Sequence, residues 1–341
     1  MTDRIQKWLQ QVSVMRYQFQ QREQSCSLFR QHPQQISIVI KIPCRSWLGA
    51  FSWGDFHMAV ALQKALKNLG FNVLLQVLPE WDAKEGEQYD VVIVFRGLNR
   101  YKCKAKQLNI MWNISHPEDV TLEEYEEYDH VFIASDIWAK EISQSLSKPV
   151  ECMLQCTDTQ RFFPPSHWDK KCDKETILFV GGTRDVFRPV IKELLPTEYS
   201  LAVYGKNWPQ FIDKKYIKGA YIPNELLYKY YGSAGIVLND HWDDMRSKGF
   251  VSNRIFDALA CGAVVVSDKV EGMGEIATFV QTYDDKYSLK QCLEFSLQHS
   301  NEVQARAYQG MKFVQREHTF GQRAKQFAAL IHRHLDIELA Q

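Results

Sequence analysis

Residues 252–268 constrain the fold more than any other stretch of the chain. Ile255, Phe256 and Leu259 recur at helical spacing and predict a helix with one apolar stripe. Gly262 is the residue type that commonly ends such a helix. The continuous apolar run that follows it is typical of a strand covered on both faces, as strands are in a parallel sheet. The stretch therefore predicts an α/β fold.

The same alternation of apolar strands and helices runs through the chain in two halves. Strands are predicted in the first half at 35–42, 71–77, 90–95, 108–114, 130–134 and 149–154, and in the second half at 176–180, 201–204, 235–238 and 263–267. Strands that alternate with helices predict β-α-β units in a parallel sheet. At 341 residues, the chain has the length of two ordinary domains. From Tyr287 onward the chain reads as helix.

Glycines and cations follow the strands of the second half. The candidates are Gly181, Gly182, Arg184 and Arg188 after the first of these strands, and Gly205, Lys206 and Trp208 after the second. Parallel sheets bind ligands at the carboxyl ends of their strands. Glycines let backbone N–H groups approach a phosphate closely, and arginines add charge. One such arginine alone would be read as surface charge, but their joint placement predicts an anion site.

The predicted helix after Ser252 carries two charged groups on one face. Arg254 and Asp257 lie three residues apart. They could form an ion pair on a solvated face. Alternatively, Asp257 could accept hydrogen bonds from a ribose diol, while Asn253, Arg254 and the helix N-terminus face a phosphate.

Arg254, Asp257, Ala258, Ala260 and Gly262 form the pattern Arg-x-x-Asp/Glu-Ala-x-Ala-x-Gly before an apolar strand. This pattern resembles the donor-site motif of GT-B glycosyltransferases, and the whole is most similar to the CgeB-like (spore-coat-protein-like) group. The acidic residue is usually Glu in such enzymes. Family 4 enzymes have a further Glu eight residues earlier, where this chain has Gly249.

The resemblance implies a GT-B fold, in which two Rossmann-like domains face a central cleft. We predict a helical extension at 1–34, an acceptor domain at 35–160, a donor domain at 161–320 and a final helix at 321–341 that crosses back onto the first domain. The implied activity is transfer of a sugar from a nucleotide-diphosphate donor to an acceptor hydroxyl in glycan or glycoconjugate biosynthesis. The glycine turn, Arg184 or Arg188, Lys206 and Arg254 would contact the diphosphate, with Arg188 favoured of the first two.

Three residues of the first half are catalytic candidates. His116 follows a predicted strand, at a place where GT-B enzymes often carry a functional histidine. It could hold the donor or serve as a base, and a structural histidine is an equal alternative. Asp55 and His57 open a predicted helix and could deprotonate an acceptor hydroxyl, although a capping role is expected for Asp55.

Composition and charge limit the kinds of partner and cofactor that we expect. Lys+Arg and Asp+Glu are equal at 41, so nucleic acid is not an expected partner. Asp240, Asp243 and Asp244 read as loop polarity, and no metal or other cofactor is expected. The acceptor could be a glycan, a lipid-linked molecule or a protein. Reduced, scattered cysteines and the absence of a signal-type apolar core in the first thirty residues predict a cytoplasmic protein.

The first thirty residues predict a helix. Ile5, Trp8, Leu9, Val12 and Met15 recur at three- and four-residue steps, so we expect this stripe to pack on the body of the protein. A peripheral membrane contact is left open, but the segment lacks a strongly basic face.

Two other functions fit the same residues. A sugar-nucleotide 2-epimerase shares this fold and would convert one nucleotide sugar into another without an acceptor. A non-catalytic nucleotide- or carbohydrate-binding protein would keep the fold without turnover, and Gly249 in place of an acidic residue keeps this alternative open.

Overall fold

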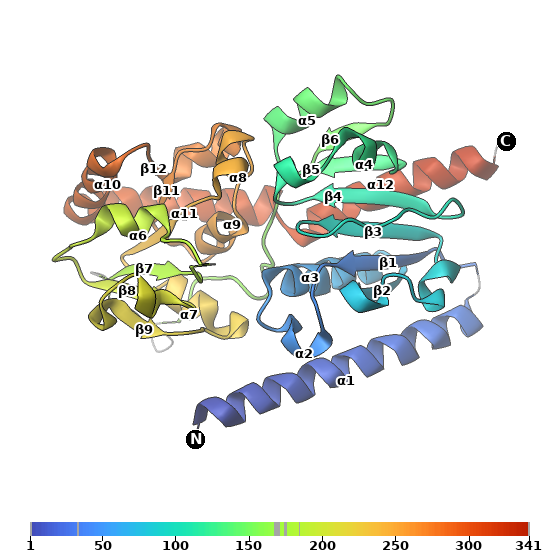
Figure 1. Ribbon diagram of the computed structural model, residues 1–341, viewed down its shortest axis with the longest axis horizontal. Helices are drawn as coiled ribbons and strands as arrows, with labels where there is room; N and C mark the ends of the chain where they lie inside the picture. Colours follow the sequence, from blue (N-terminus) through green and yellow to red (C-terminus); the bar gives the residue numbers. More distant parts are fainter. Residues whose placement is uncertain (1, 33, 167–170, 174–175, 184, 340–341) are drawn as a thin grey trace. The chain divides into compact units, whose positions relative to one another are not determined.

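The protein consists of two compact units (Figure 1). The structure is a computed structural model that describes residues 2–32, 34–166, 171–173, 176–183 and 185–339. Unit 1 comprises Met1–Leu154 with Phe320–Gln341, and unit 2 comprises Gln155–Thr319. Each unit has its own six-stranded sheet. As predicted, the final helix returns to the first unit.

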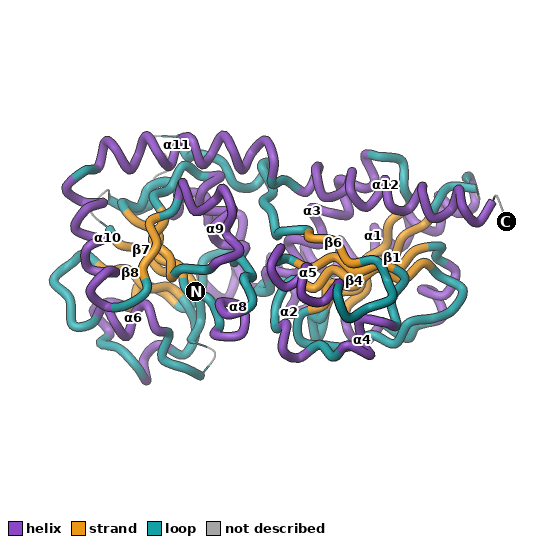
Figure 2. The backbone as a smooth tube through the Cα atoms, turned by 90° about the horizontal axis from the view of Figure 1, so that it is seen from above, coloured by secondary structure: helices purple, strands orange, loops and turns teal. Residues whose placement is uncertain are grey.

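Unit 1 is a parallel sheet with helices on both faces (Figure 2). Its strands are β1 (Ser37–Ile42), β2 (Asn72–Val77), β3 (Val91–Arg96), β4 (Leu108–Asn113), β5 (His130–Ile133) and β6 (Val150–Cys152). Its helices are α1 (Thr2–Gln31), α2 (Trp47–Ala50), α3 (Gly54–Asn68), α4 (Leu122–Glu126), α5 (Asp136–Ser143) and α12 (Phe320–Leu339). The strand order is β2-β1-β3-β4-β5-β6, and every pairing is parallel. Strands β1 to β5 are buried along their whole length, as their apolar sequences predict.

Helix α1 forms as predicted, but the expectation about which side packs was wrong. Trp8 and Met15 are exposed, whereas Val14 on the opposite side is buried. The helix is held through polar side chains. Gln21 donates to the carbonyl of Leu75 and accepts from its N–H, at 3.1 and 2.9 Å. These bonds satisfy backbone groups of β2, which is the edge strand of the sheet.

Unit 2 repeats the plan. Its strands are β7 (Ile177–Val180), β8 (Leu201–Tyr204), β9 (Ile217–Gly219), β10 (Ile236–Asn239), β11 (Val265–Asp268) and β12 (Gln281–Tyr283). Its helices are α6 (Pro189–Leu194), α7 (Leu227–Tyr231), α8 (Asp243–Ser247), α9 (Asn253–Ala260), α10 (Lys286–Gln298) and α11 (Ser300–Glu317). The strand order is β12-β11-β10-β7-β8-β9, again with parallel pairings. The short edge strands β9 and β12 were not predicted, because three residues carry too little periodicity.

The strand order creates a switch point in each sheet. In unit 1 the chain leaves β1 toward β2 and then returns to place β3 on the other side of β1. In unit 2 it leaves β7 toward β8 and β9, and then places β10 on the other side of β7. Loops diverge at such a point, and ligands of open α/β sheets bind in the resulting crevice beyond the carboxyl ends of the strands. In unit 2 this point lies between β7 and β10.

Candidate functional site

The turns after β7 and β8 are bonded to one another. The N–H of Gly181 donates to the carbonyl of Tyr204 at 2.8 Å, and the N–H of Thr183 donates to the carbonyl of Lys206 at 3.2 Å. A Cβ on Gly205 would lie 2.1 Å from the carbonyl oxygen of Gly181, so no side chain fits there. The N–H of Gly182 has no backbone acceptor among the described residues. It therefore remains available to an anion.

Trp208 holds the Gly181–Gly182 turn from the core of unit 2. Its side chain is fully buried, and its indole N–H donates to the carbonyl of Gly181 at 2.8 Å. It also packs edge-on against Phe179. Of the residues predicted after β8, Trp208 thus contacts the protein core, while Lys206 is exposed.

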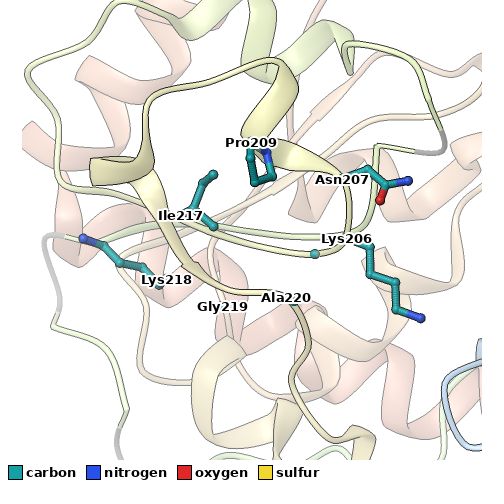
Figure 3. A pocket seen from close by; sticks show the side chains of 8 residues that line it. Lys206, Asn207, Pro209, Ile217, Lys218, Gly219 and Ala220 are labelled. Carbon is teal, nitrogen blue, oxygen red and sulfur yellow. The ribbon is translucent and has the colours of Figure 1, made fainter.

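A pocket of about 480 Å³ opens beside Lys206 (Figure 3). This volume is within the range of small-molecule sites. It lies at the carboxyl ends of β8 and β9. Its lining residues are Gly205, Lys206, Asn207, Pro209, Ile217, Lys218, Gly219 and Ala220. Two lysines make the lining positive.

Arg254 brings a guanidinium group to the β7 turn. Its Nη1 donates to Oδ1 of Asn239 at 2.6 Å, and its guanidinium lies 5.2 Å from the ring centroid of Phe179. A Cβ on Gly181 would approach Nη2 of Arg254 to 3.0 Å, so the guanidinium lies directly against the turn. Asn239 ends β10 and is itself held by Ser267 of β11 at 2.9 Å. The arginine is therefore fixed at the switch point by two neighbouring strands.

Arg188, favoured above as a diphosphate contact, is held by a buried carboxylate. It is the N-cap residue of α6 and is only 6% exposed. Its Nε donates to Oδ2 of Asp240 at 3.1 Å, and its Nη2 donates to Oδ1 and to the carbonyl of the same residue. Its guanidinium carbon lies 5.7 Å from the ring centroid of Phe179 and 5.4 Å from that of Trp242. Asp240 is 2% exposed, so its interpretation as loop polarity was wrong, and it partners a cation.

Asp257 does not pair with Arg254. Its Oδ1 accepts from the hydroxyl of Thr157 at 2.7 Å, and its Oδ2 accepts from Nδ2 of Asn253 at 2.6 Å. The residue is 8% exposed, and burial raises its pKa to about 8, although the hydrogen bond from Thr157 opposes this shift. Among the described residues, Oδ1 of Asn253 is buried without a partner. The Asp257 carboxyl therefore keeps its proton to a higher pH than an exposed aspartate does.

A buried histidine, not predicted from the sequence, holds the start of α9. Nδ1 of His241 lies 2.6 Å from Oδ1 of Asp268, and the backbone N–H of Ser252 donates to Nε2 at 2.9 Å. Asp268 ends β11, and His241 follows β10. Because the carboxylate holds the proton on Nδ1, Nε2 is free to accept from Ser252. This arrangement fixes the loop that leads to Asn253 and Arg254.

The candidates of unit 1 lie at the carboxyl edge of its sheet. His116 follows β4 and has φ 51° and ψ 56°, a left-handed backbone that non-glycine residues seldom adopt. Asp55 lies in the first turn of α3, but the N-cap residue is Trp53, so the capping expectation was wrong. A ring nitrogen of His57 lies 2.8 Å from the carbonyl oxygen of Phe51. Asp55 and His57 belong to the switch point, and His116 lies two strands away.

Arg184 lies outside the described residues. Within the described residues, no group of three or more His, Cys, Asp or Glu side chains is arranged to hold a metal ion. No described helix is long and apolar enough to cross a membrane.

Comparison with known proteins agrees with this geometry. Residues 182–329, nearly all of them in unit 2, match the family described as glycosyl transferase-like. No curated protein matches the sequence. Among solved structures, sucrose-phosphate synthase from Thermosynechococcus elongatus is similar with a TM-score of 0.65 at 14% identity, covering 88% of this chain and 100% of that one. The chain has the GT-B fold.

Two further structures have this GT-B architecture. The α,α-trehalose 6-phosphate synthase from Burkholderia multivorans aligns with a TM-score of 0.61 at 10% identity, covering 89% of this chain and 99% of that one. A T4 phage BGT mutant in complex with UDP-glucose aligns with a TM-score of 0.56 at 14% identity, covering 86% and 98%. At these identities the similarity concerns the fold.

Three residues of the site were not predicted from the sequence, for one reason. Thr157, Asn239 and His241 each act through a partner that is distant in the chain. A useful signal was present at 239–241, because three polar residues directly follow an apolar strand. That position resembles the other strand ends from which the candidates were drawn.

Proposed function

We propose that this GT-B protein transfers a sugar from a nucleotide-diphosphate donor to an acceptor hydroxyl. One observation carries the proposal: the Arg254 guanidinium is held against the Gly181–Gly182 turn at the switch point of unit 2. A fixed cation beside an unused backbone N–H is what a diphosphate requires. The family match over residues 182–329 supports the same function.

The donor site would act chiefly on the leaving group. As the sugar–phosphate bond breaks, negative charge grows on the diphosphate. Arg254, Lys206 and the N–H of Gly182 would stabilise that charge without reorganising. Arg188 would add positive charge next to this site, since its Nη1 has no hydrogen-bond partner among the described residues.

Asp257 would bind the ribose of the donor. Its two oxygens accept one hydrogen bond each in the absence of ligand, and a carboxyl group has further acceptor capacity. Because its pKa is raised to about 8, the protonated group could also donate a hydrogen bond to a ribose oxygen near neutral pH. The side chain therefore suits a diol, which both donates and accepts.

Unit 1 would bind the acceptor. His116 is the proposed catalytic group because its left-handed backbone is the kind of strain found at functional sites. We further propose a CgeB-like, cytoplasmic and metal-independent enzyme. T4 phage BGT has been solved with UDP and Mn²⁺, so metal independence has to be tested directly. The acceptor could be a glycan, a lipid-linked molecule or a protein.

Calorimetric titration with UDP, GDP, ADP and TDP tests donor binding, with and without Mg²⁺ or Mn²⁺. Arg254→Met should abolish binding of the preferred nucleotide, and Arg254→Lys should weaken it, because Lys keeps the charge but not the planar fork. Arg306→Met, on α11, removes a partly exposed arginine and should leave the affinity unchanged. Binding of no nucleotide, or equal binding by the Arg254→Met variant when it is folded, would refute the donor site.

Turnover separates the three candidate functions. Slow release of nucleoside diphosphate from a nucleotide sugar identifies a transferase, whereas interconversion of nucleotide sugars without an acceptor identifies an epimerase. Binding without either reaction leaves a non-catalytic protein. His116→Ala should lower turnover by about 10²- to 10⁴-fold while the melting temperature barely changes. Full activity in that variant would return His116 to a structural role.

A further inference from the structure

Helix α1 presents a row of large apolar side chains on its outer side. Trp8, Leu9, Val12, Met15 and Phe19, here called the outer stripe, are 60%, 54%, 43%, 55% and 63% exposed. Scattered exposed apolar residues are ordinary, but a contiguous row that includes two aromatic rings marks an interaction surface. The donor site and its chemistry lie in unit 2 and make no use of this helix.

The opposite side of α1 is already occupied. Val14 is buried, Ser25 donates to Oδ1 of Asn72 at 3.0 Å, and Arg22 pairs with Glu80 at 2.6 Å. Together with Gln21 on the edge of β2, these contacts fix the rotation of the helix on unit 1. The outer stripe cannot turn inward without breaking them. Figure 1 shows α1 running along the side of unit 1.

The spacing of the stripe identifies the kind of surface that covers it. Trp8, Val12, Met15 and Phe19 follow one another at steps of four, three and four residues. This is the 3.5-residue repeat of a seam that packs against another helix. A helix that lies on a membrane has a wide apolar face and a strongly cationic polar face. The polar positions of α1 are instead rich in glutamine.

We propose that the outer stripe binds the same stripe of a second copy of this chain, in an antiparallel pair of α1 helices. The two-fold axis crosses the helix pair at the level midway between residues 13 and 14. It places Trp8 of one copy opposite Phe19 of the other, and Val12 opposite Met15. Trp8, Val12, Met15 and Phe19 then each meet an apolar partner. Edge-to-face aromatic pairs add to what burial of their area contributes.

Charge favours the antiparallel over the parallel arrangement. A parallel pair in register would bring Arg16 of the two copies to the same level, where like charges repel. In the antiparallel register, Arg16 lies at the level of Gln11 of the other copy, so the two arginines are kept apart. The arrangement is isologous and closed, which is the commonest form of a homodimer.

The area is sufficient for a dimer of moderate affinity. Buried Trp and Phe side chains each remove roughly 150–250 Å² from water. With their aliphatic neighbours, two copies of the stripe would bury on the order of 1,000 Å², which is where biological interfaces begin. We therefore expect a reversible dimer rather than an obligate one.

Sedimentation velocity of the full chain between about 1 and 100 μM tests the proposal, over a range that suits an interface of this size. The parent should pass from monomer to dimer, and Trp8→Gln/Phe19→Gln should stay monomeric at every concentration with unchanged circular dichroism. Tyr287→Gln removes an aromatic ring that is 70% exposed on α10, and that variant should dimerise as the parent does. A parent that stays monomeric, or a double variant that still dimerises, overturns the proposal.

Cross-linking tests the direction of the pair. Val12→Cys and Met15→Cys variants, each in a Cys26→Ser background, should form a disulfide between positions 12 and 15 when mixed. Neither variant alone should form it between like positions. In the parent, which keeps Cys26 exposed on the same side of α1, a disulfide between the two copies of Cys26 would indicate a parallel pair and overturn the antiparallel register. If the parent stays monomeric but sediments with phosphatidylglycerol vesicles, and Trp8→Gln/Phe19→Gln does not, the outer stripe binds lipid and the dimer proposal is wrong.

Discussion

Each unit buries an arginine–carboxylate pair at the carboxyl edge of its sheet, and the two pairs differ in how completely they are bonded. In unit 1, Arg96 donates to both oxygens of Glu124 at 2.6 and 3.0 Å, to the carbonyl of Asp119 at 2.7 Å and to the carbonyl of Gly97. In unit 2, Arg188 is bonded to Asp240 alone among the described residues. The first guanidinium is nearly saturated, and the second retains donors.

The difference suggests a division of labour. Arg96 ties the end of β3 to the loop that follows His116, so its role is to hold that loop. Arg188 spans the switch point between the β7 and β10 turns and keeps Nη1 available. A buried cation that is fully bonded stabilises structure, whereas one with remaining donors can also bind an anion.

Removing the saturated arginine should have the largest effect. Arg96→Met leaves the carboxylate of Glu124 buried without its cation, and we expect a loss of about 3–5 kcal/mol in the free energy of unfolding. Urea denaturation followed by tryptophan fluorescence measures it. Arg100→Met breaks the exposed pair with Glu127, where the side chains are 51% and 37% exposed, and should change stability by less than about 1 kcal/mol. Similar losses in the two variants would contradict the assignment of Arg96.

The role of the Arg188–Asp240 pair can be tested by measuring stability and nucleotide binding separately. Arg188→Met alone should destabilise unit 2, because Asp240 is left buried and charged. Arg188→Met/Asp240→Leu removes both charges and should recover much of that stability, since apolar replacements of buried pairs are often neutral. We expect the double variant to remain weaker in nucleotide affinity by calorimetry. Recovery of affinity together with stability would show that Arg188 acts only through the fold.

The third test concerns the carboxyl group beside these cations. The pKa of Asp257 is raised from 3.8 to about 8, so the folded state keeps a proton that the unfolded state releases between these values. Stability should therefore fall as pH rises from about 4 to about 8, and the fall should disappear in Asp257→Asn. Melting temperatures from pH 4.5 to 8.5 check this. The free Oδ1 of Asn253 can accept from the introduced amide, so the fold should survive.

The same variant tests the ribose contact. Above about pH 8, where the Asp257 carboxyl is charged, hydrogen bonds to it are worth about 1.5–3 kcal/mol, so nucleotide affinity measured there should fall by roughly ten- to a hundredfold. Unchanged affinity for every nucleotide that the parent binds would separate Asp257 from the donor site while leaving the pH effect intact.

Much of the architecture was predictable because the apolar patterns are strong. The helix and strand at 252–268 appear as α9 and β11, and the main strands of both sheets lie within a few residues of their predicted ranges. The meeting of Gly181 with Arg254 was also foreseeable, since parallel strands end at one edge. Which residues then bond to each other was not. Arg254 bonds to Asn239 rather than to Asp257, and Arg188 bonds to Asp240. The order of the strands in the sheet, and not the spacing of residues along the chain, sets the distances between these side chains.

The sequence by itself determined the α/β class, the parallel strands and the edge of the sheet where the polar residues gather, because burial leaves a local record in apolar periodicity. Only the tertiary structure decided the orientation of α1 and the ionic partners. Periodicity identifies an apolar stripe but not what covers it, and here the polar Gln21 and Ser25 pack inward because the edge of β2 needs hydrogen-bond partners. Such a choice depends on contacts between residues about 50 positions apart, which no local pattern encodes.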